Sequence, residues 1–594
     1  MKHPPTMNYR IIAQTLLLAL ALSACDKKPA EAIELSAQPS ALSFTAEGGT
    51  QELVVTCGAR PLVTCTSDWI SVKHGDYAAN TLPVRITAGK NTDSFARTAQ
   101  LRIIGDKQNL TVNVTQDARE VELFVSADSF PFSRFGGETE FTVTSTGRPQ
   151  VTSDVDWCGV AVGDANAQQQ TTVKLLVAAN RTDQAQTGTV TVKCGPDKVT
   201  VRVSREAGGN IPVAQAEELT PQQVFDAVAP GWNLGNQMDA INNGVSGETV
   251  WGNPRCTQAT FDGVKAAGFK AVRICVTWEG HIGPAPAHRL EEKWLARVAE
   301  IVEYAHNAGL VAIVNTHHDE THWLDIAKAY DNTTRNEAVK NEIFCVWTQI
   351  AQRFADKGDW LILESFNEIQ DGGWGWSDAF RKNPQAQYSV LNEWNQLFVD
   401  AVRSTGGQNA TRWLGVPGYA ASPAFTVAGF EFPKDYTTGN RLIVAVHDYD
   451  PYNYTLSNPL VRQWGHTADA DKRVSDRDEQ NLVAVFDNLK SAYVDKGLPV
   501  YFGEMGCSRH EAADLPYQRY YMEYFCKGAA DRVLPMFLWD NGFDGTGSET
   551  HAYIHHATGQ FVNDESRTLV GLMVKAVTEK DPAYTLESVY ESAP

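Results

Sequence analysis

Eight short apolar runs separated by helix-like stretches constrain the fold of this chain more than any other feature of its sequence. Segments between the runs, such as 291–309, carry apolar residues at helical spacing. Strands that are apolar throughout and alternate with helices form parallel sheets, and eight such units close into a barrel. We therefore predict an α/β (β/α)8 TIM barrel over residues 221–585. The predicted strands are 231–236, 270–276, 310–316, 360–366, 412–417, 441–446, 498–503 and 532–539.

Residues 34–207 have a different pattern, which repeats. They are rich in Thr and Val, alternate apolar with polar residues and contain Gly turns, as short β-strands do. The segment FTAEGGTQELVVT (44–56) matches FSRFGGETEFTVT (132–144) at an offset of 88, and Trp69 and Trp157 keep this offset. The repeat predicts two all-β, Ig-like sandwiches at 34–118 and 119–207, followed by a linker at 208–220.

The repeated motifs resemble BACON domains, which are Ig-like modules found on surface lipoproteins of Bacteroidetes. The resemblance rests on the Gly-Gly turn, the Asp-Trp pair and the closing Val-rich strand of each unit. Arg205 departs from it, because Gln is usual at the end of that strand. We expect Trp69 and Trp157 to be core residues and the modules to be spacers; glycan binding on these tryptophans is the alternative.

The N-terminus predicts export. Lys2 and Arg10 precede an apolar run that is too short to span a membrane and is typical of a secretory signal. The run ends in Leu-Ser-Ala before Cys25, which resembles a lipobox. We predict a signal peptide at 1–24 and a lipid anchor on Cys25, the only membrane attachment, in the bacterial outer membrane at the cell surface. An ordinary signal peptide followed by an incidental Cys is the alternative.

Composition limits the classes of partner. The net charge of −20 opposes nucleic acid but is compatible with a neutral polysaccharide. No CxxC pair and no phosphate-binding Gly loop is present, so we expect no structural zinc and no cofactor. His318 and His322 are spaced like a metal pair, but no HExxH motif is present and we expect no metal. The protein is expected to be monomeric.

Polar residues follow the ends of most of the apolar runs. In a β/α barrel these ends meet at one face, whatever their separation in sequence. Each residue alone has a structural explanation, such as a solvated charge, a salt bridge or a core aromatic, but together they predict an active site. The residues are Arg273, Asn315, His317, His318, Asn367, Glu368, His447, Tyr449, Glu504, Trp539 and Asp540.

Two of these carboxylates suit glycoside hydrolysis. One carboxylic acid protonates the leaving oxygen, while a carboxylate stabilises or attacks the anomeric centre. Arg273 and Tyr449 near Glu504 would favour its ionised form, which leaves Glu368 as the acid. The carboxyl groups should lie about 5–5.5 Å apart if the reaction retains configuration, and roughly 6.5–9.5 Å if it inverts.

Several neighbours have expected roles in holding a sugar. Asn367 is placed to contact a sugar 2-hydroxyl, and Trp539 offers an aromatic face. Trp374 and Trp376 lie on the loop that follows the fourth strand and could stack further sugar units. Glu364, partway along that strand, is expected to be structural.

The motifs GWNLGN, ETVWGNP, NTHHD, FNEI, VHDYDPYNY, GEMG and WDNG, over about 215–580, resemble subfamily 4 of glycoside hydrolase family 5. That family consists of retaining β-glycanases. The resemblance implies Glu368 as acid/base and Glu504 as nucleophile. It also implies that Arg273, His317, Asn367, His447, Tyr449 and Trp539 line the sugar site. One departure is RICV, where Cys275 replaces the usual Pro and could alter the placement of Arg273.

Together these features predict a retaining endo-acting β-1,4-glucan hydrolase for cellulose-like chains, mixed-linkage glucan or xyloglucan. Two alternatives remain open. The same fold could act on β-mannan or xylan, or the protein could be a surface glycan-binding lipoprotein without catalytic activity.

Overall fold

The computed structural model of the protein describes residues 33–93, 95–120 and 122–594. It divides into two compact units: the first reaches to Leu123 and includes loops 145–148 and 194–197, and the second contains the remaining residues. The predicted signal peptide and Cys25 lie outside the described residues, so export and lipidation stay predictions. Within the described residues, no helix combines the length and apolarity needed to cross a bilayer.

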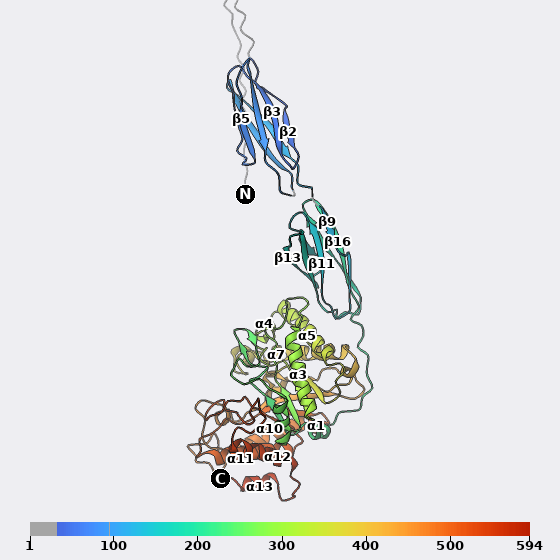
Figure 1. The fold of residues 1–594 in the computed structure, drawn as a ribbon. Coiled ribbons are helices and arrows are strands. Elements are labelled where there is room, and N and C mark those ends of the chain that lie inside the picture. The colour runs from blue at the N-terminus through green and yellow to red at the C-terminus, as the bar shows by residue number, and fades with distance from the viewer. Residues whose placement is uncertain (1–32, 94, 121) are drawn as a thin grey trace, which may run out of the picture. The chain divides into compact units, whose positions relative to one another are not determined.

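The first repeat is a sandwich of two four-stranded sheets, with strand orders β1-β3-β6-β5 and β2-β8-β7-β4 (Figure 1). Alternate residues of its strands point into one core, which contains Leu53, Val55, Val84 and Ile86. The strands are β1 (Ser36–Gln38), β2 (Ala41–Phe44), β3 (Gly49–Thr56), β4 (Leu62–Thr64), β5 (Ile70–His74), β6 (Thr81–Ala88), β7 (Arg97–Gly105) and β8 (Gln108–Gln116).

The second repeat has the same topology. Its sheets run β13-β14-β11-β9 and β10-β16-β15-β12, which is the order of the first repeat with each strand number raised by eight. The predicted internal repeat is therefore also a repeat of the fold. The strands are β9 (Leu123–Val125), β10 (Ser129–Phe132), β11 (Gly137–Ser145), β12 (Gln150–Ser153), β13 (Cys158–Ala165), β14 (Gln170–Val177), β15 (Gln186–Cys194) and β16 (Asp197–Arg205).

An arginine covers one face of the tryptophan in each sandwich. The guanidinium carbon of Arg97 lies 4.5 Å from the ring centroid of Trp69, and that of Arg205 lies 4.5 Å from the ring centroid of Trp157. Both indoles are only partly exposed. A covered face cannot stack on a sugar, which favours the structural interpretation of these tryptophans.

The two sandwiches contain the same Arg–Gln pair, but the two residue types occupy opposite strands. In the first sandwich Arg97 on β7 donates to Gln116 on β8 at 2.9 Å. In the second, Arg205 on β16 donates to Gln186 on β15, also at 2.9 Å. The departure from the BACON pattern is thus compensated on the neighbouring strand, and the pair is kept.

Both arginines satisfy equivalent backbone carbonyls. Arg97 bonds those of Gly89 and Lys90, and Arg205 bonds those of Ala178 and Ala179. Arg205 is 7% exposed, so its removal would leave polar groups buried without partners.

We expect Arg205→Gln alone to destabilise the second sandwich by about 1–3 kcal/mol, because the Ala179 carbonyl and the Gln186 side chain lose their donor. The double variant Gln186→Arg/Arg205→Gln should recover most of this loss by adopting the arrangement of the first sandwich. Hydrogen exchange of peptides covering 170–177 and 197–205 in the full chain measures it. Equal exchange in the single and double variants would contradict the compensation.

The C-terminal part forms a closed barrel of eight strands in sequence order, each paired in parallel with the next. All eight strands overlap the predicted apolar runs, so the predicted TIM barrel is confirmed. They are β17 (Gly231–Leu234), β20 (Ala271–Ile274), β21 (Val311–Val314), β22 (Leu361–Glu364), β23 (Leu414–Pro417), β24 (Leu442–Asp448), β25 (Val500–Met505) and β26 (Met536–Leu538).

Helices follow the strands, and a two-stranded hairpin of β18 (Ile241–Asn242) and β19 (Val245–Ser246) follows β17. The stretch predicted at 291–309 is helical over almost its whole length. The helices are α1 (Pro221–Val228), α2 (Gln258–Ala266), α3 (Glu292–Asn307), α4 (Ile326–Ala329), α5 (Thr333–Arg353), α6 (Asp378–Lys382), α7 (Pro384–Ser404), α8 (Pro423–Gly429), α9 (Tyr452–Thr455), α10 (Asp478–Ala492), α11 (Leu515–Ala530), α12 (Asp564–Thr578) and α13 (Leu586–Glu591).

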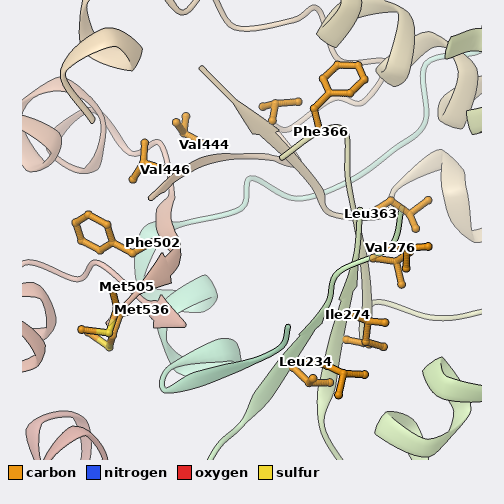
Figure 2. Packing of buried hydrophobic residues seen from close by; sticks show 14 of the residues in the cluster. Leu234, Ile274, Val276, Leu363, Phe366, Val444, Val446, Phe502, Met505 and Met536 are labelled. Atoms are coloured by element: carbon orange, nitrogen blue, oxygen red, sulfur yellow. The ribbon is translucent and has the colours of Figure 1, made fainter. Parts of the chain in front are cut away.

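Two hydrophobic clusters sort the strand residues by face. One side of the strands packs with the helices in an outer cluster that includes Leu234, Ile274, Leu363 and Val444 (Figure 2). The other side forms an inner cluster of Ala271, Ile313, Ile362, Ile443, Ala445, Tyr501 and Phe537, together with Leu219, Val224 and Val228 at α1. The barrel interior is therefore packed beneath its C-terminal rim.

Candidate active site

The two-residue alternation of the barrel strands turns three polar side chains toward the interior. Ala271, Ile362 and Ala445 belong to the inner cluster. The residues two positions further along the same strands face the same side, nearer the C-terminal rim. They are Arg273, Glu364 and His447, all buried.

An irregularity in β25 turns Glu504 inward as well. Phe502 and Met505 both belong to the outer cluster, which leaves Gly503 and Glu504 between them. The register of β25 shifts against β24 immediately before His447, and against β26 between Phe502 and Met505. Such a bulge re-aims a side chain. A Cβ at Gly503 would lie 3.0 Å from Nε2 of His447, so the glycine leaves room for this imidazole.

Glu368 and Glu504 lie close together at the strand ends. One carboxylate oxygen of each lies within 4.8 Å of the other. Their side chains are 18% and 6% exposed, so both are largely shielded from water. Such a close approach of two carboxylate oxygens suits pairs in which one carboxylate attacks the anomeric carbon directly, whereas inverting pairs are spaced to accommodate a water molecule.

Glu504 accepts hydrogen bonds from two donors predicted for it. Nη1 of Arg273 lies 2.8 Å from Oε1, and the hydroxyl of Tyr449 lies 2.9 Å from Oε2. Burial raises the pKa of Glu504 above its ordinary value, while His447 and Arg273 act against this rise. The donors therefore favour the ionised form, as expected, but burial outweighs them, which the sequence alone could not indicate.

Glu368 contacts an imidazole instead of a permanent cation. Nδ1 of His447 lies 2.7 Å from its Oε1. Burial, reinforced by the charge of Glu320, raises the pKa of Glu368 to about 7, and burial lowers the pKa of His447 to about 4. The ring tautomer of His447 sets the direction of this bond; where Nδ1 donates to Oε1, Oε2 is left to carry the proton of the acid. The surroundings of the two carboxyl groups thus differ: a guanidinium and a phenol donate to Glu504, whereas Glu368 has an imidazole and a pKa raised to about 7.

Arg273 is shared between two carboxylates. Its Nε and Nη2 lie 3.0 and 2.7 Å from Oε1 of Glu364, in addition to the contact with Glu504. Both members of the Arg273–Glu364 pair are fully buried. The hydroxyl of Tyr501 donates to the other oxygen of Glu364 at 2.5 Å. The sequence predicts a structural role for Glu364 but does not indicate this partner; Tyr501, inward-facing on β25, was also missed.

His317 points a protonated nitrogen toward Glu504. Its Nδ1 lies 3.2 Å from the amide nitrogen of Asn315, whose Oδ1 accepts from the backbone of Val276. The amide orientation is thereby fixed, so the proton of the neutral ring resides on Nε2, 3.8 Å from Oε1 of Glu504. Burial holds the pKa of His317 well below its ordinary value, so the ring stays neutral.

His318 is a cation in the same corner of the site. Although burial opposes it, the carboxylates of Glu320 and Asp239 raise the pKa of His318 to about 9. Its Nε2 lies 3.7 Å from Asp239 and its Nδ1 lies 3.6 Å from Glu320. The sequence does not indicate Asp239 and Glu320, because Asp239 lies beyond the end of β17 and Glu320 resembles an ordinary loop charge.

Of the remaining predicted residues, two lie beside the residues already described, one is exposed on a loop and one is structural. Asn367 accepts from Arg273 at 2.8 Å, which leaves its amide nitrogen to donate to a ligand. The ring of Trp539 lies parallel to that of His317, with centroids 5.7 Å apart. Trp376 is 77% exposed on the loop after β22. Asp540 is fully buried and accepts from the indole of Trp232 at 2.9 Å, which is a structural role.

Metal binding does not fit His317. Among the described residues, three groups bring possible ligand atoms within 4.8 Å of one another, and none includes His322. Two of them use His317, whose Nε2 carries the ring proton. Ligation there would require losing the hydrogen bond from Asn315. The third group is the Glu368–Glu504 pair with His447.

Cys275, the departure from the family pattern, leaves Arg273 in contact with Glu504. Its thiol is fully buried, 3.5 Å from Nη1 of Arg273 and 3.5 Å from Oδ1 of Asn233. Burial raises its pKa well above the ordinary value, so the sulfur stays neutral. The nine described cysteines are all free thiols.

Two buried carboxyl groups with different hydrogen-bond donors lie at the C-terminal rim of a β/α barrel. This arrangement is that of a glycoside hydrolase. Comparison with known families agrees. The family described as Cellulase (glycosyl hydrolase family 5) matches residues 235–545, more than half of the chain. The chain belongs to this family. A putative binding domain called BACON matches residues 62–117, and a viral BACON domain matches residues 122–207.

Individual proteins extend the comparison. Endoglucanase A of Paenibacillus barcinonensis is 36% identical over 347 residues, covering 56% of this chain and 85% of that protein. A xyloglucan-specific endo-β-1,4-glucanase of Bacteroides ovatus is 29% identical over 477 residues, covering 75% and 90%. The solved structure of a GH5-4 broad specificity endoglucanase from Bacteroides salanitronis is 49% identical, covers 62% and 98%, and has a TM-score of 0.59.

Removal of divalent metal should leave the hydrolytic activity unchanged, because His317 is held as a donor by Asn315 and offers no lone pair at Nε2. Rates on carboxymethyl cellulose before and after dialysis against a chelator measure this. Loss of activity that returns on adding back a metal ion would contradict the tautomer assigned to His317.

Proposed function

We propose that the protein is a retaining, endo-acting β-1,4-glucan hydrolase in which Glu504 is the nucleophile and Glu368 is the acid/base. The observation that carries the proposal is the close approach of two carboxyl groups with opposite surroundings. Glu504 has a guanidinium and a phenol as donors, whereas Glu368 has an imidazole.

In the first step, the Glu504 carboxylate attacks the anomeric carbon while Glu368 gives its proton to the glycosidic oxygen. The bond to the leaving chain breaks and a glycosyl ester forms on Glu504. The amide of Asn367 donates to the 2-hydroxyl, a contact that strengthens as positive charge develops on the ring. His317 donates from Nε2 to an oxygen of the same sugar or of the ester.

In the second step, the ionised Glu368 takes a proton from water as the water attacks the anomeric carbon. The ester breaks, Glu504 leaves as a carboxylate and the configuration is restored. Arg273 and Tyr449 stabilise the negative charge that returns to Glu504, so the same two donors assist both the ionised nucleophile and its departure.

A polymeric substrate is favoured by the position of the exposed aromatic residues. Among the described residues of the barrel, the large exposed aromatics are Trp374, Trp376, Tyr452 and Phe543, and each follows the C-terminal end of a strand. Stacking platforms beyond the catalytic pair suit a long glycan bound across this face. The related endoglucanases and the xyloglucan-specific relative act on such chains, which supports a β-1,4-glucan backbone.

Azide should separate the roles of the two glutamates. With an activated aryl β-cellobioside, Glu504→Ala plus azide should yield the α-glycosyl azide, because azide enters from the side that the nucleophile occupied. Glu368→Ala plus azide should yield the β-azide, because azide replaces water in the second step. Nuclear magnetic resonance of the products distinguishes them. Full activity of either variant without azide would refute the proposed mechanism.

Trp376→Ala should weaken the action on polymer without affecting a short substrate. Loss of an exposed stacking platform of about 0.5–1.5 kcal/mol predicts a KM for β-glucan roughly 2–12 times higher. The rate on an aryl β-cellobioside should stay unchanged. Phe124→Ala, which removes another exposed aromatic but from the second sandwich, is the control. Equal KM values in Trp376→Ala and the control would exclude Trp376 as a binding platform.

We also propose that the chain is exported and tethered through a lipid on Cys25, with the two sandwiches as spacers and the enzyme acting as a monomer. The lipobox-like sequence supports the anchor, and the covered tryptophans support the spacer role.

A further inference from the structure

Glu364 is a carboxylate near the reaction centre to which the proposed mechanism gives no task. It is the last residue of β22, its side chain faces the barrel interior and is fully buried, and several hydrogen bonds fix its position. Arg273 donates to it from Nε and Nη2. Tyr501 donates to Oε2 at 2.5 Å, and Asn315 donates to Oε1 at 3.1 Å. A carboxylate with so many donors stays ionised.

Its main partner also holds the nucleophile. Arg273 uses Nη1 for Glu504 at 2.8 Å and the opposite edge of the guanidinium for Glu364 at 2.7 Å. One positive charge therefore faces two negative charges in a largely buried region, where charges interact strongly. Any change at Glu364 must alter how much of that positive charge is available to Glu504.

We propose that Glu364 is a positioning residue that divides the charge of Arg273, so that Glu504 is held in place without being neutralised by a full ion pair. A carboxylate fully paired with a guanidinium is a weaker nucleophile and a better leaving group. Glu364 thus speeds formation of the glycosyl ester and slows its breakdown. The inference rests on the assignment of Glu504 as nucleophile.

Tyr501 provides the opposite change on the same network. Its hydroxyl takes up part of the negative charge of Glu364 at Oε2. Without this bond, Glu364 would compete more strongly for Arg273 and leave Glu504 with less positive charge. Glu364→Gln and Tyr501→Phe should therefore shift the behaviour of Glu504 in opposite directions, which a merely structural role of either residue does not predict.

The acid limb of the kcat/KM profile on an aryl β-cellobioside reports ionisation of Glu504 in the free enzyme. Glu504 must be ionised to attack, so activity rises as pH passes upward through its pKa. Glu364→Gln should move this limb to lower pH by about one unit, and Tyr501→Phe should move it to higher pH. The alkaline limb, where Glu368 with a pKa of about 7 loses its proton, should stay in place in both variants.

Rapid mixing with the same substrate supplies the second readout. In Glu364→Gln, ester formation should slow about tenfold or more relative to ester breakdown, so the burst of released aryl group should shrink. Asp435→Asn is the matched control, because it breaks another buried carboxylate pair, with Nε of Arg403 at 2.7 Å, away from the active site. It should lower the Tm without moving either pH limb.

Unmoved acid limbs in both variants, or shifts in the same direction, would overturn the proposal. If Glu364→Gln does not fold, Tyr501→Phe still decides it, since the expected shift to higher pH has a fixed sign. Failure of the proposed function is separate: it would show as activity remaining in Glu504→Ala, whatever the pH profiles of the other variants.

Discussion

The active site depends on one guanidinium that is shared by two strands and a loop. Arg273 on β20 contacts Glu364 on β22, Glu504 on β25 and Asn367 beyond β22. These residues are separated by 91, 231 and 94 positions in the chain, and a single planar group fixes their relative positions. The rigid fork of an arginine suits this task, whereas the flexible point charge of a lysine would not.

The difference between the two carboxyl groups follows from this arrangement and not from distance alone. Both are buried, and burial raises the pKa of each. Only Glu504 has a permanent cation within hydrogen-bonding distance. Glu368 has a neutral imidazole and the nearby charge of Glu320, so the proton of the pair resides on Glu368. Opposite roles thus arise from neighbours that come from different strands.

Much of this could be predicted from the sequence, because strand ends in a β/α barrel converge whatever their separation. The eight strands and the grouping of Glu368, Glu504, Arg273, His447 and Tyr449 follow from that rule. What the sequence could not reveal was which partner each residue takes. The sequence predicts only a structural role for Glu364, because nothing in a linear sequence indicates that the guanidinium of Arg273 contacts two carboxylates.

The position of Glu504 marks another limit of pattern analysis. A regular strand would place it on the side of Phe502, among the helices, because side chains alternate. The bulge inserts one extra inward position, and Gly503 fills it without obstructing His447. Periodicity identifies the strand but not a one-residue irregularity within it, and catalytic residues often lie at such irregularities.

The exchange of Arg and Gln between the two sandwiches has the same origin. Judged at one position, Arg205 departs from the pattern of its domain. Judged as a pair with Gln186, it keeps the guanidinium over the tryptophan and the two backbone carbonyls satisfied. The same contact is supplied from either of two neighbouring strands. A residue that differs from its motif therefore has to be compared with its cross-strand neighbour before the difference is interpreted as a lost contact.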